Sequence, residues 1–212
     1  MKNTLMKKLL TCGMLAGPLY VGLWVLQIFI RKGYDPSRHD LSLLSNGDLG
    51  WIQITNFLVS GLLVILGAAG LRHAMQKGKG RIAGPLLLGL YGLGLIGAGF
   101  FIADPMMGFP PGTPEGMPKA ISFNGMMHLV SGSIGFLGLI AACMVLARRF
   151  ASLKKKGLAV YSVATGVIFF VAFAGIASGS ANTVIVLAFS GAVILAWTWI
   201  SFISALFMKG NL

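Results

Sequence analysis

Long apolar stretches separated by short polar segments dominate the pattern along this chain. Five stretches contain no charged residue, and they cover residues 9–30, 52–71, 82–103, 129–147 and 157–208. A charged residue at the centre of a spanning helix costs about 2.5–3.5 kcal/mol, so charge-free stretches of about 20 residues predict membrane-spanning helices. The last stretch would be about 78 Å long as one helix, far more than a bilayer, so it must fold back. Residues 178–182 (Ser-Gly-Ser-Ala-Asn) are typical of a turn.

The pattern therefore predicts an all-α polytopic membrane protein, with residues 1–212 forming a single membrane domain. We expect a bundle of six transmembrane helices at about residues 9–30, 52–75, 82–103, 125–147, 157–177 and 183–207. The composition agrees, because 56% of the residues are hydrophobic and only 10% are charged. Soluble domains have about 25% charged residues. The lipid bilayer is the expected partner.

The distribution of basic residues predicts the orientation of this bundle. The net charge is +12, and 13 of the 17 Lys and Arg residues fall on one side of the predicted helices. These are Lys2, Lys7, Lys8, Arg72, Lys77, Lys79, Arg81, Arg148, Arg149, Lys154, Lys155, Lys156 and Lys209. Short cytoplasmic loops retain Lys and Arg, so we expect an inner or plasma membrane location with both termini cytoplasmic. The same placement accounts for the charge without nucleic acid, for which the chain has no recognition signature.

The opposite side of the predicted bundle differs in charge and in loop length. It contains all five acidic residues, which are Asp35, Asp40, Asp48, Asp104 and Glu115. Two predicted loops on this side, residues 31–51 and 104–124, are each about 20 residues long. Loops of this length in a compact protein are usually functional or disordered. We therefore look for function on this side.

Polar residues enter the predicted helices mainly on the acidic side. Gln53, Asn56 and Ser60 recur at i, i+3 and i+7, so they share one helix face, and His128 and Ser131 do the same on the fourth helix. We expect a polar cluster between the second, third and fourth helices. Its simplest role is a network of hydrogen bonds that ties these helices together.

Asp104 and His128 are the candidate catalytic residues. Asp104 ends the third predicted helix at about the depth at which His128 begins the fourth, so antiparallel packing would bring them together. A carboxylate at a helix C-terminus faces the negative end of the helix dipole and needs another source of stabilisation. The Asp104 carboxylate could be stabilised by His128, by the direction of the chain before Pro105, or by water. In an enzyme, His128 would be the base or ligand and Asp104 would orient it. The candidate binding residues are Asp35, Arg38, Asp40, Gln53, Asn56 and Ser131.

No cofactor and no metal ion are predicted. A bis-histidine haem needs two facing histidines inside the bundle, but His39 is in a loop and His73 is at the basic rim. Several methionines near the second long loop resemble a soft-metal site, although such residues are more often adaptable apolar packing, here a plug or lid. They are Met106, Met107, Met117, Met126 and Met127.

Several short motifs resemble the DUF998 family of bacterial and archaeal membrane proteins. They are residues 33–42 (Gly-Tyr-Asp-Pro-Ser-Arg-His-Asp-Leu-Ser), Trp51, 101–105 (Phe-Ile-Ala-Asp-Pro), 110–113 (Pro-Pro-Gly-Thr) and 125–128 (Gly-Met-Met-His). The resemblance covers nearly the whole chain. It implies a six-helix architecture and directs attention to Asp104 and His128. It implies no substrate, because the family has no assigned function.

Two functional hypotheses remain open at this point. The first is a packing or partner-binding module whose outer face contacts a lipid or another envelope component. The alternative is a membrane-embedded enzyme that acts on a lipid or lipid-linked substrate at the outer leaflet. A small-solute transporter is a weaker third hypothesis, because transporters commonly have broken helices in paired positions and only Gly17-Pro18 is a clear candidate. The sequence does not indicate an oligomeric state.

Overall fold

The computed structural model describes residues 2–179 and 181–210, and within them it contains six long α-helices and no strand. The helices are α1 (Lys2–Ile30), α2 (Gly50–Ala74), α3 (Ala83–Phe100), α4 (Phe123–Ser152), α5 (Lys156–Ala177) and α6 (Thr183–Met208). All six are long and apolar enough to cross a membrane. The predicted six-helix fold is confirmed. The turn predicted over residues 178–182 includes residue 180, which lies outside the described residues.

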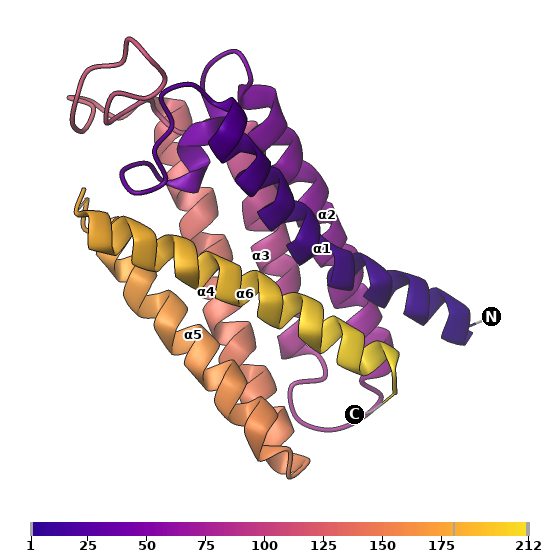
Figure 1. Cartoon of the computed structure of the whole chain (residues 1–212). Coiled ribbons are helices and arrows are strands. Elements are labelled where there is room, and N and C mark those ends of the chain that lie inside the picture. Colours follow the sequence, from indigo (N-terminus) through magenta and orange to yellow (C-terminus); the bar gives the residue numbers. More distant parts are fainter. Residues whose placement is uncertain (1, 180, 211–212) are drawn as a thin grey trace.

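The six helices form a closed ring. Each packs against its neighbours in the chain, and α6 returns to pack against α1. Figure 1 shows long loops at one end of the ring and both ends of the described chain at the other. We call the end with residues 31–49, 101–122, 178–179 and 181–182 the acidic end, because it carries all five side-chain carboxylates. The opposite end is the basic end. It contains the start of α1, the end of α6 and residues 75–82 and 153–155.

Helix boundaries differ from the predicted ones mainly at the basic end. Helix α1 begins at Lys2 rather than near residue 9, and α4 continues to Ser152 rather than ending near residue 147. Charged residues do not end these helices, because long Lys and Arg side chains can reach water from the last turns. At the acidic end, α3 stops at Phe100, four residues before the pre-proline residue Asp104. Pro18 lies inside α1, which continues through it as one helix.

Close backbone contacts hold the middle helices together. A Cβ atom added to Gly94 would lie 2.6 Å from Cα of Gly135, so α3 and α4 touch where neither residue has a side chain. Gly61 and Gly92 make a similar contact between α2 and α3. Helices in lipid associate mainly through packing, and small residues allow the close approach. The glycine-rich third and fourth helices are therefore tightly packed, as their sequences indicate.

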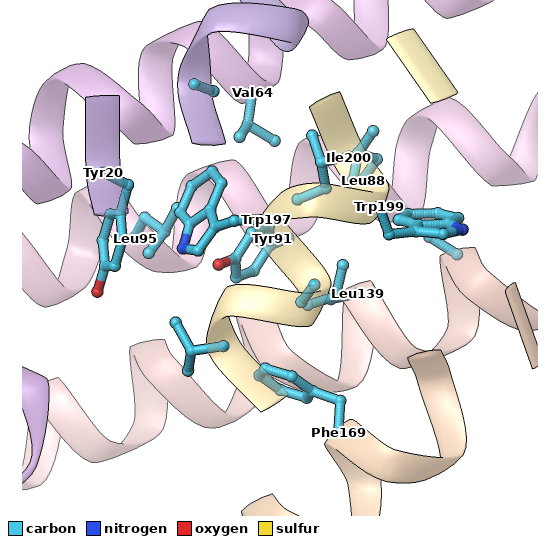
Figure 2. Packing of buried hydrophobic residues seen from close by; sticks show 14 of the residues in the cluster. Tyr20, Val64, Leu88, Tyr91, Leu95, Leu139, Phe169, Trp197, Trp199 and Ile200 are labelled. Carbon is cyan, nitrogen blue, oxygen red and sulfur yellow. The ribbon is translucent and has the colours of Figure 1, made fainter. Parts of the chain in front are cut away.

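An aromatic layer fills the centre of the ring. The Trp197 side chain is fully buried and stacks on Tyr20, with 4.6 Å between ring centroids, while the Tyr91 ring lies 5.6 Å away on another side. Figure 2 shows Tyr20, Trp197 and Tyr91 in sequence across the bundle. The Phe136 ring contacts Phe169 edge to face at a centroid distance of 5.1 Å. This layer closes the bundle below the acidic end.

Part of the first long loop folds into the bundle. Residues Leu41–Ser45 form a short 3-10 helix, η1, and Leu41, Leu43 and Leu44 are each at most 3% exposed. The polar pattern of residues 31–51 predicts a loop throughout, so η1 is a correction to that prediction. The three leucines are the signal for the buried element, since they are the apolar part of an otherwise polar connection.

Candidate functional site

The polar face of α2 packs against α1. Gln27 Nε2 donates to Gln53 Oε1 at 2.8 Å, and Asn56 Nδ2 donates to the Tyr20 carbonyl at 3.1 Å. Ser60 Oγ donates to Asn56 Oδ1 at 3.2 Å. All four polar side chains are fully buried. The α2 residues were predicted to face the third and fourth helices, and this placement is corrected, because their partners outside α2 come from the first helix. They form an interhelical hydrogen-bond network.

His128 is held by the end of α3. Its side chain is 7% exposed, and Nδ1–H donates to the carbonyl oxygens of Phe101 at 2.8 Å and Ala98 at 3.1 Å. Two carbonyl acceptors fix the proton on Nδ1, so the neutral ring carries its lone pair on Nε2. The Phe57 ring contacts the imidazole edge to face, with 6.1 Å between centroids. The orientation of His128 is thus set by backbone oxygens and one aromatic ring.

Asp104 belongs to the start of α4 rather than to the end of α3. Its Oδ2 accepts from the Ser122 N–H at 2.9 Å, and the Ser122 hydroxyl accepts from the Gly125 N–H at 2.9 Å as the cap of α4. A Cβ atom at Gly125 would overlap the Asp104 carboxylate, so the glycine makes room for it. The positive N-terminus of α4 favours this carboxylate, which answers the question raised by its position in the sequence. In the described chain, Asp104 makes no hydrogen bond to His128.

Arg31 joins three segments at the acidic end. Its side chain is 7% exposed; Nη1 donates to the Leu44 carbonyl at 2.6 Å, and Nη2 donates to the Asn46 carbonyl. The guanidinium lies over the Phe109 ring, 5.2 Å from its centroid. Cation–π attraction adds to the charge-assisted hydrogen bonds. Arg31 therefore fixes the η1 segment beneath the second long loop.

Further contacts tie the two long loops to each other. The Asp35 N–H donates to His39 Nδ1 at 2.9 Å, which leaves the proton on Nε2 to donate to the Met107 carbonyl at 2.9 Å. Arg38 and Glu115 form an ion pair at 2.8 Å, but both side chains are largely exposed. Such exposed pairs contribute about 0–1 kcal/mol. The buried His39 contact is the stronger link. We call the joined segments 31–49 and 101–122 the cap; both lie at the same end of the ring in Figure 1.

A cavity of about 450 Å³ lies between the cap and the aromatic layer. Four of the candidate residues line it: Arg38, Asp40, Asp104 and His128. Asp35, Gln53, Asn56 and Ser131 are not among its lining residues, and Ser131 instead packs against Gly97 of α3. The rest of the wall is mostly apolar and comes from all six helices. Its main apolar residues are Phe57, Leu95, Ala98, Leu129, Phe136, Phe173, Ile176, Val186, Phe189 and Val193.

Among the carboxylates that line the cavity, Asp40 has a clearly shifted pKa. It is half-buried, and burial raises its pKa to about 6. Asp35 behaves in the opposite way, since hydrogen bonds from the Ser37 hydroxyl and N–H lower its pKa. Asp40 therefore changes charge nearer to neutral pH, at the mouth of the cavity, whereas Asp35 remains an anion that shapes the loop.

The side chains of the cap and the cavity also bear on metal binding. Within residues 2–179 and 181–210, no group of three or more His, Cys, Asp or Glu side chains is placed to hold a metal ion. Met106, Met107 and Met117 line the cavity under the cap. In this position they are adaptable apolar wall, with flexible side chains that can follow the shape of a ligand.

Three buried polar residues hold these segments together, although the sequence did not single them out for this role. Arg31 was counted only as a charge, His39 only as a loop histidine, and Gln27 was not singled out. Gln27 was detectable, because a glutamine inside an apolar stretch needs a partner and Gln53 lies near the same end of the next helix. The partners of Arg31 and His39 are loop carbonyls, which leave no signature in the sequence.

Comparison with known proteins gives one match. No curated protein and no solved structure matches the chain. The family model described as "Protein of unknown function (DUF998)" matches residues 14–206, which include all the elements of the cap and the cavity described above. The chain therefore belongs to the DUF998 family.

Proposed function

We propose that the protein lies in the cytoplasmic membrane with its acidic end outward and both termini in the cytoplasm. The support is the unequal distribution of basic residues, 13 of 17 of which belong to the basic end. Lys and Arg in short loops are retained on the cytoplasmic side during insertion. In this orientation the cap and the cavity lie at the level of the outer leaflet.

We propose further that the cavity binds a lipid or a lipid-linked molecule from the outer leaflet. The observation that carries this proposal is the division of the cavity wall. Its interior is formed by apolar side chains of the helices, while its charged side chains, Arg38, Asp40 and Asp104, belong to the cap. An amphiphile has the same division into an apolar chain and a polar head. Burial of the chain in the wall supplies the affinity, and the cap selects the head.

The groups at the mouth define the head that fits. His128 Nε2 offers a lone pair, because Nδ1–H is occupied by two carbonyls. Asp40 and Asp104 offer carboxylate oxygens, and Arg38 is already paired with Glu115. Three acceptors against one paired cation favour a head rich in hydrogen-bond donors, such as sugar hydroxyls or an amine, over a bare phosphate. The volume of about 450 Å³ lies within the range of about 300–1,000 Å³ usual for ligand pockets.

Two glycines provide a matched test. Gly132 lines the cavity, Gly191 on α6 does not, and neither has a neighbouring atom within 4 Å of an added Cβ. Gly132→Leu fills the cavity, whereas Gly191→Leu adds the same atoms to an exposed helix face. We expect Gly132→Leu to weaken binding of a fluorescent glycolipid at least tenfold in detergent micelles, and Gly191→Leu to leave it unchanged. Equal binding by both variants, with unchanged melting temperatures, would reject the cavity as the site.

A membrane-embedded enzyme is the second candidate, favoured by the state of His128. A histidine with Nδ1–H anchored and Nε2 unpartnered is oriented as a general base is. The same preparations test this by mass spectrometry of the bound lipid. Chemical conversion that is lost in His128→Gln, while binding is retained, would support an enzyme. Conversion at the same rate in His128→Gln would exclude His128 as its base.

A further inference from the structure

Hydrogen bonds from α4 fix the conformation of the loop between α2 and α3 at the basic end. Arg149 of α4 is 7% exposed, and its Nη1 donates to the Lys77 carbonyl at 2.8 Å and the Lys79 carbonyl at 3.2 Å. Gly78 and Gly80 adopt φ values of 95° and 73°, in the left-handed region open to glycine. With its carbonyls directed to Arg149, the loop leaves the side chains of Lys77 and Lys79 exposed.

This loop lines an open pocket with positive walls. The lining residues are Lys77, Gly78, Gly80, Arg81, Ile82 and Ala83. None of the chain's side-chain carboxylates belongs to the basic end, so the cations of this loop have no acidic side chain nearby to pair with. The pocket is therefore an electrostatic site for an anion.

The start of α3 adds to the positive character of this pocket. Ile82 makes no side-chain cap, but the Gly84 N–H donates to the Gly80 carbonyl at 2.9 Å and Pro85 has no N–H, so the helix contributes mainly the positive end of its dipole. Arg81, which lines the pocket, has a buried Nε without a hydrogen-bond partner in the described chain. Helix N-termini beside cationic side chains are typical binding places for phosphate groups.

An exposed apolar stripe begins at the pocket and runs along α3. Ile82, Leu86 and Leu93 are 57%, 68% and 58% exposed, and Gly89 between them has no atom within 4 Å of an added Cβ. Their spacing of 4, 3 and 4 residues places them on one helix face. Helix α3 packs between α2 and α4, so this face is turned away from both. From Ile82 to Leu93 the stripe is about 16 Å long, about half of the hydrocarbon thickness.

We infer that the basic pocket and the stripe together bind one anionic phospholipid of the leaflet at the basic end. The phosphate group lies beside Lys77 and Arg81 at the positive end of α3, and the exposed Lys79 of the same loop adds to the positive charge around it. The acyl chain follows the stripe past Gly89. The pocket alone would suit a free phosphate equally well, but a free phosphate makes no use of an apolar surface that begins beside it. This site is separate from the cavity under the cap and does not depend on the function proposed for it.

The test compares two triple variants of equal charge. In one, Lys77, Lys79 and Arg81 are changed to Gln; in the other, Lys154, Lys155 and Lys156 of the α4–α5 connection are changed to Gln. Phosphatidylglycerol and phosphatidylcholine are titrated onto the detergent-solubilised protein, and bound lipids are counted by native mass spectrometry. Near a membrane surface each Lys or Arg adds about 1 kcal/mol to anionic lipid binding, so we expect the first variant to bind phosphatidylglycerol at least about tenfold more weakly. We expect less than a twofold change in the second.

Competition separates a lipid from its soluble headgroup. Glycerol phosphate and inorganic phosphate should displace phosphatidylglycerol only at a large excess, and the double variant Lys77→Arg with Lys79→Arg should bind like the wild type. The melting temperature of each variant verifies folding; if the triple variant does not fold, Lys77→Gln alone should still weaken binding about threefold. An equal loss in both triple variants, equal affinity for phosphatidylcholine, or easy displacement by phosphate would overturn the inference.

Discussion

At each end of the bundle a buried arginine anchors a loop, but the surroundings of the two arginines differ. Arg31 at the acidic end and Arg149 at the basic end are each 7% exposed. Each donates to two backbone carbonyls of a neighbouring loop and lies over a phenylalanine, Phe109 at 5.2 Å and Phe207 at 5.9 Å. A cation, two carbonyls and one ring are enough to fix an irregular segment where a helix bundle ends.

The difference between the ends lies in what each arginine holds. Arg31 binds the carbonyls of Leu44 and Asn46, which are buried, and so it anchors a cap that closes over a cavity. Arg149 binds the carbonyls of two exposed residues, Lys77 and Lys79, in part-buried hydrogen bonds, and so it anchors a short basic loop at the surface. The two anchored loops differ in length and charge, and the residues whose carbonyls they present differ in burial, which should set how much each arginine contributes to stability.

Removing Arg31 should have the largest effect. Arg31→Met keeps the apolar stem but leaves the buried carbonyls of Leu44 and Asn46 without donors and removes the contact with Phe109. Hydrogen bonds to charged groups contribute about 1.5–3 kcal/mol each, so we expect a loss of about 4 kcal/mol in the free energy of unfolding. Denaturant titration in detergent measures it. The exposed neighbour Lys32 is the control, and Lys32→Met should cost less than 0.5 kcal/mol by the usual size of surface effects, about ±0.5 kcal/mol. Similar losses in the two variants would refute the anchoring role of Arg31.

Asp40 gives the stability of the acidic end a pH dependence. Burial raises the pKa of its carboxyl from 3.8 to about 6. The protonated form is favoured in the fold, so this contribution to stability is complete below pH 3.8 and is lost as the pH rises through about 6. Asp40→Asn should remove this slope and raise the free energy of unfolding above pH 6 by up to about 3 kcal/mol.

The measurement is stability against pH for Asp40→Asn beside Asp35→Asn. Hydrogen bonds from Ser37 lower the pKa of Asp35, so its contribution has the opposite sign and is lost as the pH falls. Asp35→Asn should therefore lower stability at neutral pH. A wild-type slope between pH 4 and 6 that survives in Asp40→Asn would show that another group carries it.

How much of this could be predicted from the sequence differs between the helices and the cap. The six spans follow from charge-free stretches, because the cost of a buried charge in lipid limits where a helix can cross. The depth of His128 and Asp104 followed as well. Their partners did not, since His128 and Asp104 bind backbone groups of Phe101 and Ser122, and a backbone group has no residue type to recognise.

The polar face of α2 shows a second limit. Periodicity correctly placed Gln53, Asn56 and Ser60 on one face, but it does not say which neighbour the face meets. The close glycine contact at Gly61 and Gly92 turns another face of α2 towards α3, and the polar face is left for α1. The cavity was also beyond prediction, because it is formed by side chains of all six helices, which come together at the acidic end only in the folded chain.

Removing Arg149 should have the smallest effect of the three, and it tests the reason given for the difference between the ends. Arg149→Met leaves the carbonyls of Lys77 and Lys79 without donors, but both residues are exposed, so water replaces the guanidinium. We expect a loss of about 2 kcal/mol in the free energy of unfolding, about half of that for Arg31→Met. The adjacent Arg148 is exposed and serves as the control.

Glycolipid binding under the cap should not change in Arg149→Met, whereas phosphatidylglycerol binding at the basic end should weaken, because the loop loses the group that holds its shape. A loss as large as that for Arg31→Met would show that burial of the carbonyls does not set the difference between the two arginines.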